Sequence, residues 1–324
     1  MWSRLKNASS RWLHRRQVQP PSDHHNVPFN PVNYSKRNPA EIQTDVEFSI
    51  RSARLISGFM RDRGIEPNRA HFLELGPGTH FGAPLILASM GVQVTLADRF
   101  LARWQEQYHP ALYRELHRAW DGPKRAIEAV LDANGYPDGV LNLLEEPGES
   151  LVSLPAESVD FTYSNAVLEH VVEMRRVAQE LSRIMRRGAT GAHQVDMRYH
   201  ADFTQPLEHL VMSDDEYAQE TAVHGFERGN RLRPSEFIAL FESCGLQVTE
   251  FDGNCQADPA YLADAVQRLR LAQSSYRRWP EGELSSIGGR FFIRKLDGGE
   301  AQALKQSAEE RLLTYAHRKG EYSS

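Results

Sequence analysis

Cysteine is nearly absent from this sequence of 324 residues, in which Cys244 and Cys255 are the only two. Two cysteines cannot build a disulfide framework, and their spacing is not that of a metal-binding pair. A composition so poor in cysteine is typical of proteins in a reducing compartment, so we expect a cytoplasmic location.

A long apolar run and an excess of basic residues are also missing. No stretch approaches the roughly 20 consecutive apolar residues of a membrane-spanning helix, which excludes that class of protein. The 38 Lys and Arg residues are outnumbered by 43 Asp and Glu residues, whereas dedicated nucleic-acid-binding proteins usually show the opposite. We therefore expect no nucleic-acid partner. The 40% hydrophobic and 25% charged residues are typical of a globular protein.

Residues 1–43 differ from the rest and are predicted to be a basic, proline-rich extension. Residues 1–16 carry five Lys and Arg and no acid, and their Trp and Leu residues would share one helical face. Such a segment can lie on an anionic membrane surface, here the inner face, or dock a partner. We favour a frayed end over both. Five prolines between residues 18 and 40 predict an irregular tether.

Strands alternate with helices between residues 44 and 298. Thr44 and Glu47 form a predicted capping box for the first helix, which ends near Gly64. Seven strands are predicted, at 71–75, 92–97, 140–144, 159–163, 191–197, 246–251 and 287–295. The alternation indicates an α/β fold: a doubly wound, mostly parallel, seven-stranded Rossmann-like sheet with helices on both faces.

The intervening segments have helical spacing. Helices are expected up to about Met90 and then over 101–120, 123–134, 172–187, 234–243 and 259–272, with Gly188 ending the fourth of these. The alternation loosens after the fifth strand, which predicts a late helical insertion at about 199–235. Residues 299–324 are predicted to be a polar C-terminal helix and tail.

A glycine loop follows the first predicted strand, with Gly76, Pro77 and Gly78 in sequence. Glycines allow positive φ and leave no Cβ between the backbone and a ligand. In open α/β sheets, ligands bind at the carboxyl ends of strands. Asp98 ends the second strand, 20 residues after Gly78, where a carboxylate can accept hydrogen bonds from both ribose hydroxyls. The pattern predicts a nucleotide-like ligand.

Two details favour a methyl donor over a dinucleotide. Glu74 stands where dinucleotide folds usually have an apolar residue, and an acid there can hold the ammonium group of S-adenosylmethionine. The glycine spacing, with Gly82 four residues after Gly78, also departs from the G-x-G-x-x-G pattern that packs against a pyrophosphate. An NAD(P)-dependent oxidoreductase and a catalytically silent cofactor-binding module remain the alternatives.

Residues 71–98, together with the segment DFTYSNAVLEH at 160–170, resemble the class I S-adenosylmethionine-dependent methyltransferases. The resemblance covers about half of the chain and departs from the family pattern in two places: His80 replaces a third glycine, and the acid expected near the adenine is displaced to Glu149. It implies S-adenosylmethionine as the cofactor. The residues assigned to the cofactor are Glu74, Gly76, Pro77, Gly78, Asp98, Arg99, Ser164 and Asn165.

Methyl transfer to a hydroxyl requires an aligned nucleophile and a group that removes its proton. His170 follows the fourth strand immediately, and Asp196 and His200 lie at the end of the fifth. These three are the catalytic candidates, although His170 could equally be a helix-start histidine bonded to backbone. Asp196 and Asp202 are weak candidates for a divalent metal that nothing in the sequence requires.

Four further residues are candidates for acceptor binding. Strand alternation places His193, Val195 and Met197 on one face and Arg198 on the other. Two arginines before a predicted helix suit an anionic group, although surface charge is an equally good explanation. The acceptor candidates are His193, Arg198, Arg231 and Arg233.

The segment FTQPLEHL, with this His-rich loop, loosely resembles methyltransferases associated with bacterial surface polysaccharides. That resemblance implies O-methylation of a small molecule or glycan hydroxyl. The sequence indicates no oligomeric state.

Overall fold

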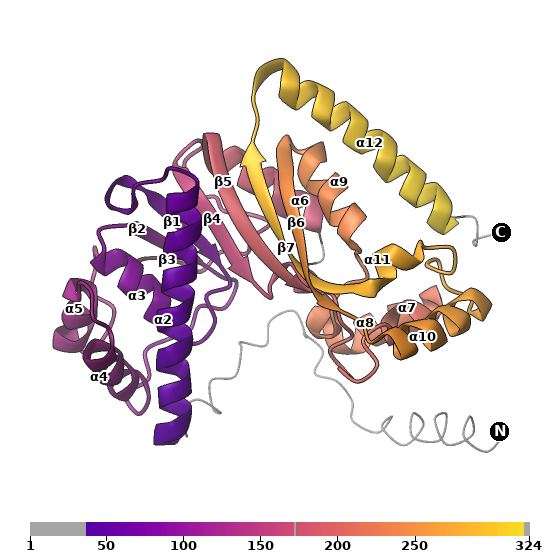
Figure 1. Cartoon of the computed structure of the whole chain (residues 1–324). Coiled ribbons are helices and arrows are strands. Elements are labelled where there is room, and N and C mark those ends of the chain that lie inside the picture. The colour runs from indigo at the N-terminus through magenta and orange to yellow at the C-terminus, as the bar shows by residue number, and fades with distance from the viewer. Residues whose placement is uncertain (1–36, 172, 321–324) are drawn as a thin grey trace.

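The computed structural model describes residues 37–171 and 173–320 (Figure 1). Residues 1–16, for which a membrane contact was considered, lie outside this range. No helix within the described residues has the length and apolarity needed to cross a membrane.

Seven strands form one sheet in the order β3-β2-β1-β4-β5-β7-β6. β7 runs antiparallel to both of its neighbours, and the other neighbouring pairs are parallel. The predicted α/β, mostly parallel sheet is therefore confirmed. The strands are β1 (His71–Leu75), β2 (Gln93–Ala97), β3 (Asn142–Leu144), β4 (Val159–Asn165), β5 (Met185–Asp196), β6 (Leu246–Gln256) and β7 (Ser286–Lys295).

Helices cover both faces of this sheet, as predicted (Figure 1). On one face lie α2 (Pro39–Asp62), α3 (Gly82–Ser89), α4 (His109–Ala119) and α5 (Arg125–Ala133). On the other lie α6 (Met174–Ile184) and α9 (Pro234–Ser243), with α12 (Gly298–Gly320) packed outside α9.

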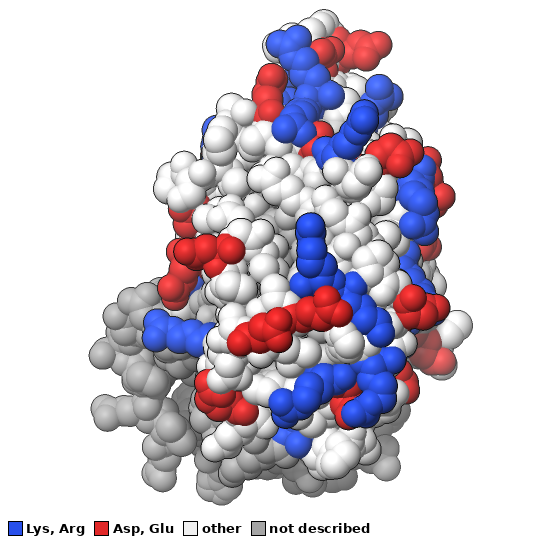
Figure 2. All heavy atoms as spheres, turned by 90° about the vertical axis from the view of Figure 1, so that its left-hand side faces the viewer, with Lys and Arg blue, Asp and Glu red and all other residues white. Residues whose placement is uncertain are grey.

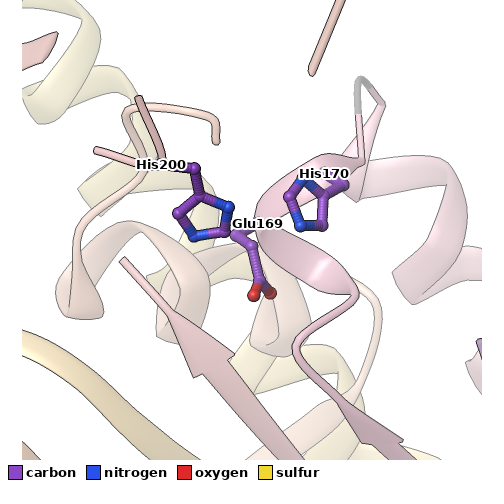
Figure 3. Close-up of side chains that lie close together, drawn as sticks. All are labelled: Glu169, His170 and His200. Atoms are coloured by element: carbon purple, nitrogen blue, oxygen red, sulfur yellow. The ribbon is translucent and has the colours of Figure 1, made fainter. Parts of the chain in front are cut away.

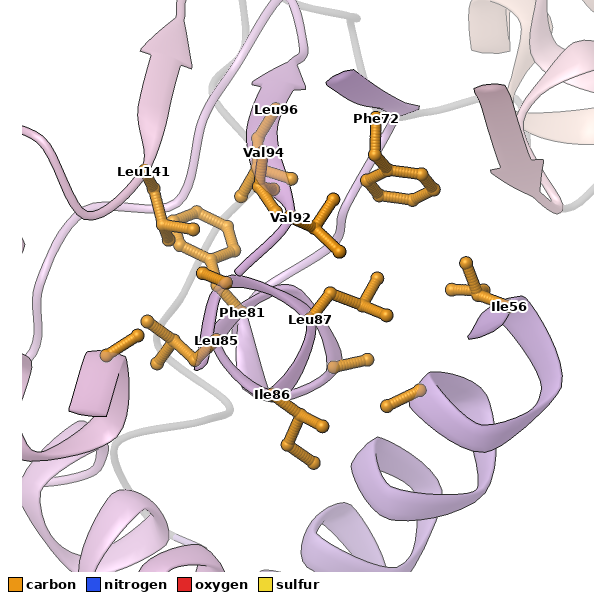
Figure 4. Close-up of a cluster of buried hydrophobic side chains, with 14 of the residues drawn as sticks. Ile56, Phe72, Phe81, Leu85, Ile86, Leu87, Val92, Val94, Leu96 and Leu141 are labelled. Atoms are coloured by element: carbon orange, nitrogen blue, oxygen red, sulfur yellow. The ribbon is translucent and has the colours of Figure 1, made fainter. Parts of the chain in front are cut away.

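β1 lies in the interior of the sheet, between β2 and β4, and is buried along its whole length. Successive residues face opposite layers: Phe72 belongs to the core beneath α2 and α3, and Leu73 to the core beneath α6 and α9. Figure 4 shows the first of these cores, where Leu87 of α3 lies between the sheet and Ile56 of α2. Burial on both faces explains why β1 is apolar except at His71 and Glu74.

The predicted start of the first helix was wrong. α2 begins at Pro39, and Asn38 accepts hydrogen bonds from the backbone N–H groups of Ala40 and Glu41, while Glu41 accepts one from Asn38 N–H. Proline at the first helical position favours this start because its fixed φ suits the helix. Thr44 lies inside α2, where its hydroxyl donates to the Ala40 carbonyl.

The predicted end of the helix that follows the fourth strand was also wrong. α6 ends at Ile184, and β5 begins with the next residue. Gly188 lies within β5 at φ +72°, where the pairing with β4 changes register between Met185 and Thr190. The glycine permits this irregularity and does not end the helix.

The predicted insertion is one half of a small helical subdomain. α7 (Glu208–Val211) and α8 (Asp214–His224) lie beside α10 (Pro259–Leu271) and α11 (Glu281–Ser285) at the end of the sheet where β5 finishes (Figure 1). Leu207 and Leu210 share a core with Leu269 and Trp279. The segment between β6 and β7 was not expected to complete this unit.

The close approach of α2 and α3 can be tested at Gly82. A Cβ at this position would lie 2.2 Å from Ser49 Oγ and 2.7 Å from Ser49 Cβ. Gly82→Ala should therefore lower the free energy of unfolding by about 1–3 kcal/mol, measured by urea denaturation. Adding Ser49→Gly should recover part of the loss, less the helical cost of glycine. Equal stability of Gly82→Ala and the wild type would contradict this packing.

Candidate active site

Loops that follow β1, β2, β4 and β5 meet at one edge of the sheet, because these strands are mutually parallel. They carry the glycine loop, Asp98, the turn at 166–171 and the segment after Asp196. Ligands of open α/β sheets bind at this edge. The edge lies between the N-terminal half of α2 and the helical subdomain (Figure 1).

The two loop glycines have different physical roles. Gly76 has φ +63°, and a Cβ there would come within 2.4 Å of Val167 Cγ2, so it permits close packing against the turn after β4. Gly78 has φ +75°, and its missing Cβ would meet nothing within 4 Å. Its backbone therefore faces open space, as a ligand-binding loop requires.

Glu74 is the most unusual group of this loop. Its side chain is buried, and burial raises the pKa of its carboxyl group to about 8. One carboxylate oxygen, Oε2, is buried without a hydrogen-bond partner among the described residues. A buried carboxylate without a partner is costly, and a ligand's ammonium group would relieve that cost.

Asp98 lies at the end of β2 with one oxygen already used. Its Oδ1 accepts a hydrogen bond of 2.9 Å from Phe100 N–H, and burial raises the pKa of its carboxyl group despite that bond. Arg99, the next residue, forms a 3.9 Å ion pair with Glu149. Glu149, the displaced acid of the sequence pattern, therefore lies beside the residue that follows Asp98.

His80, the atypical residue of the loop, packs under α2. Its ring lies 6.2 Å from that of Phe48 and 6.5 Å from that of Tyr108, edge-on in both cases. Tyr108 in turn donates a 2.8 Å hydrogen bond to Asp45 of α2. Burial lowers the pKa of His80 to about 4, so the ring is neutral. The loop accommodates a side chain here because it points into this aromatic layer.

Two predicted contact residues turn out to belong to the interior. His193 is fully buried and stacks on Phe241, and its ring nitrogens lie 2.9 Å from Ser164 Oγ and 3.2 Å from Thr162 Oγ1. Burial lowers its pKa to about 3, so it is neutral. His193 therefore does not reach an acceptor, and the Ser164 hydroxyl is engaged by His193. Asn165, one residue on, is exposed at the end of β4.

His170 and His200 meet where the loops after β4 and β5 converge. Their ring centroids are 4.8 Å apart, and Figure 3 shows both rings beside the carboxylate of Glu169. Burial lowers the pKa of His200, and the neighbouring His170 adds to this. The structure thus brings together two of the three predicted catalytic residues, which are separated by 30 positions in the sequence.

Asp196, the third catalytic candidate, forms an ion pair with Arg198. Two hydrogen bonds of 2.8 and 2.6 Å join the guanidinium of Arg198 to both Asp196 oxygens. Burial opposes ionisation of Asp196, but these bonds outweigh it and lower its pKa. Asp196 is therefore a weak base, and Arg198 is tied in place. Asp202, a metal candidate, instead accepts hydrogen bonds from the backbone and hydroxyl of Thr204.

The two arginines predicted to bind the acceptor stabilise the fold. Arg233 is fully buried and donates hydrogen bonds to the carbonyls of Met197 and Ser286, which joins the end of β5 to the start of β7. Arg231 is buried as well, with an ion pair of 2.6 Å to Asp214. Their prediction as acceptor contacts was wrong because burial leaves their guanidinium groups facing the protein.

Two cavities lie away from this edge. One of about 580 Å³ opens on the exposed face of β5, β7 and β6, around Arg63 and Arg290. Another of about 750 Å³ runs along β2 and β3 beside α5. Neither contacts the glycine loop, so the candidate site is defined by its side chains and not by these cavities.

Comparison with known proteins supports a methyltransferase. Residues 73–192, which hold the glycine loop, Asp98 and both ends of β4, match a family model described as a methyltransferase domain. These residues form a class I, S-adenosylmethionine-dependent methyltransferase domain. S-adenosylmethionine is the methyl donor of this class. When it is bound, we expect the buried Glu74 to pair with its ammonium group, Asp98 to accept hydrogen bonds from its ribose, and the open loop at Gly78 to lie against it.

Solved structures resemble the chain only distantly. A proposed sarcosine dimethylglycine methyltransferase from Galdieria sulphuraria is 16% identical, with 76% of this chain and 86% of that chain covered and a TM-score of 0.45. An S-adenosylmethionine-dependent methyltransferase from Mesorhizobium loti is 16% identical, covers 75% and 98%, and has a TM-score of 0.42. A geranyl diphosphate C-methyltransferase from Streptomyces coelicolor A3(2) is 14% identical, covers 76% and 76%, and has a TM-score of 0.43. No protein with a curated description matches the chain.

Cofactor binding should depend on pH through Glu74. Below pH 8 the free protein holds this carboxyl protonated, and the proton must leave before the carboxylate can pair with an ammonium group. Affinity for S-adenosylmethionine should rise about tenfold per pH unit between pH 6 and 7.5 and level off near pH 8. Calorimetry in buffers of different ionisation enthalpy should detect the released proton. Glu74→Gln should bind weakly and without this slope, and an unchanged slope would remove Glu74 from the site.

Asp98 offers a second test of the cofactor site. Asp98→Ala removes a carboxylate that can accept two hydrogen bonds from ribose, together worth about 3 kcal/mol. We expect the dissociation constant for S-adenosylmethionine to rise about a hundredfold in a calorimetric titration. Asp132→Ala, on the far end of α5, serves as the matched control. An Asp98 variant with wild-type affinity would show that the ribose lies elsewhere.

Proposed function

We propose that this protein transfers a methyl group from S-adenosylmethionine to a hydroxyl of a small molecule or glycan. One observation carries the proposal: His170 and His200 lie together at the ends of β4 and β5, at the same edge as the glycine loop. Among side chains, imidazole is the one best suited to promote proton loss near neutral pH. A hydroxyl needs that help before it can attack, whereas a neutral amine does not.

Different residues of the chain would bind the cofactor, position the acceptor and accept the proton. When bound, the cofactor supplies an activated methyl group on a positively charged sulfur. Glu74 and Asp98 would hold its ammonium group and its ribose, while the loops after β4 and β5 would place the acceptor oxygen in line with the methyl carbon. As the new C–O bond forms, the bond between the methyl carbon and sulfur would break to leave S-adenosylhomocysteine, and the hydroxyl proton would pass to the His170–His200 pair. Asp196, 3.8 Å from His200 Nε2, favours the resulting positive charge.

The surroundings of the pair suit a ring-shaped acceptor. Phe203 is 53% exposed, its ring lies 5.4 Å from that of His200, and the Arg198 guanidinium lies 4.4 Å from its centroid. An exposed aromatic face beside polar groups can bind a sugar, which has an apolar face and a polar rim. This supports a sugar acceptor. A place in surface-polysaccharide biosynthesis, in the cytoplasm, stays a prediction from the sequence.

The face of the molecule that carries the N-terminal helices gives no support for a nucleic-acid acceptor. Figure 2 shows Lys and Arg interspersed with Asp and Glu on the face that carries the N-terminal helices, without a continuous basic region. Nucleic-acid binding relies on such a region. The acceptor that we propose remains a small molecule or a glycan.

The acceptor class can be determined directly. Purified protein with isotopically labelled S-adenosylmethionine would be incubated with nucleotide sugars, oligosaccharides and amine acceptors of similar size. Mass spectrometry should find label on a hydroxyl oxygen. Labelled amines alone would replace the proposal with N-methylation. Tight binding of S-adenosylhomocysteine with no turnover on any acceptor would favour the catalytically silent alternative.

The histidine pair makes a separate prediction. His170→Ala and His200→Ala should each lower kcat by about 10²–10⁴-fold, the usual contribution of a group that assists proton transfer. Affinity for S-adenosylmethionine should change by less than about threefold, because neither ring belongs to the glycine loop. His117→Ala, which alters an exposed pair with Glu128, is the control. Full turnover in both site variants would exclude the pair from the reaction.

A further inference from the structure

Three ligand-type side chains converge at the acceptor end of the site. Glu169 and His170 come from the short helix η4 (Leu168–His170) after β4, and His200 from the loop after β5. One possible ligand atom from each lies within 4.8 Å of the others. Figure 3 shows the two imidazole rings on either side of the carboxylate.

The carboxylate of Glu169 is buried without a well-formed hydrogen bond. Glu169 is 1% exposed, and neither of its oxygens has a hydrogen-bond partner among the described residues. His200 Nε2 is likewise buried without a hydrogen bond, with only the 3.8 Å approach of Asp196 beside it. Buried polar groups are nearly always satisfied, so two orphaned groups that face each other indicate a missing partner. A metal cation would satisfy both groups at once, because it accepts lone pairs from oxygen and nitrogen.

A neighbouring network holds these groups in position. Asn230 of the insertion donates side-chain hydrogen bonds to the carbonyls of Leu168 and Val171, and its backbone N–H bonds to the Glu169 carbonyl. The short helix is therefore fixed at both ends and in the middle. Such rigidity would keep metal ligands in position before an ion binds.

We propose that Glu169, His170 and His200 bind a divalent transition-metal ion such as Zn²⁺, Mn²⁺ or Co²⁺. Two imidazoles and one carboxylate form a three-ligand set that leaves a coordination position open for a substrate. Imidazole ligands favour these ions over Ca²⁺ and Mg²⁺, which prefer oxygen alone. Metal bonds of about 2.1 Å would place tetrahedral ligand atoms about 3.4 Å apart, so the cluster closes by small side-chain rotations.

The ion would deepen the function proposed above and rests on it. An acceptor hydroxyl bound at the open position would lose its proton more readily, because the ion stabilises the alkoxide. The two imidazoles would then promote proton loss through the ion, and the proton would pass to solvent. A sugar diol could use two positions at once, which would select acceptors with adjacent hydroxyls.

Metal binding can be measured without any acceptor. Protein freed of metal by a chelator would be titrated with Co²⁺, followed by its visible absorption, and with Zn²⁺ by calorimetry, with Mg²⁺ for comparison. We expect about one Co²⁺ or Zn²⁺ per chain and no saturable Mg²⁺ site. Glu169→Gln and His200→Ala should each weaken binding at least tenfold. Asp202→Asn and His117→Ala, which lie outside the cluster, should bind like the wild type.

Thermal unfolding separates loss of the site from loss of the fold. Metal-free Glu169→Gln should be at least as stable as the metal-free wild type, because it removes a buried charge. Zn²⁺ should raise the Tm of the wild type and leave that of Glu169→Gln unchanged. Less than a tenth of an equivalent bound, or equal affinity in Glu169→Gln and the wild type, would overturn the inference.

Failure of the metal site and failure of the proposed function would give different experimental results. Hydroxyl methylation at full rate in chelator, with no metal bound, would remove the ion and leave the proposed function intact. Stoichiometric metal binding abolished by Glu169→Gln would establish the site even if every methylated acceptor proves to be an amine.

Discussion

Two buried carboxyl groups without hydrogen-bond partners, at one edge of the sheet, are the constraint on which the site depends. Glu74 and Glu169 are both buried, both lack hydrogen-bond partners for carboxylate oxygens, and burial raises the pKa of each carboxyl group to about 8. Neither arrangement stabilises the fold, since a buried charge without a partner costs free energy. Both make sense as places prepared for cations: an ammonium group at the first and, as we propose, a metal ion at the second.

The rest of the fold holds these two carboxylates at their positions. Glu74 lies on β1, an interior strand that is packed on both faces by the two main cores. Glu169 follows β4, the neighbour of β1, and Asn230 ties its short helix to the insertion. Arg233 fixes the end of β5, from which His200 departs three residues after Met197. The acceptor end of the site is therefore assembled by contacts that are themselves remote from the chemistry.

Much of the fold was predictable because its strands and glycines have strong local patterns. All seven strands were found, and so was the loop of Gly76 and Gly78. The errors arose where two local signals competed. Thr44 and Glu47 have the spacing of a capping box, but Asn38 and Pro39 start the helix earlier. Gly188 is a plausible helix end, but the strand had already begun at Met185.

For the site, the sequence predicted correctly which strand ends form it. It was less successful at predicting which side chains face the ligand. Period-two alternation correctly placed His193 with Val195 on the buried face, yet that placement argues against a contact with the acceptor. Arg231 and Arg233 precede a helix, which suits anion binding, but only the three-dimensional structure shows that both are buried. The meeting of Glu169 with His200 joins two loops that no local pattern relates.

The helical subdomain beside His200 has a consequence for how the protein is made. Its core is built from Leu207 and Leu210 before β6 and from Leu269 and Trp279 after it. During synthesis, the methyltransferase domain at 73–192 leaves the ribosome well before residue 279 does, and domains tend to fold in that order. The loops after β1, β2 and β4 are thus outside the ribosome before the helical subdomain is complete. The chain would present the residues expected to bind the methyl donor before it acquires a complete place for the acceptor.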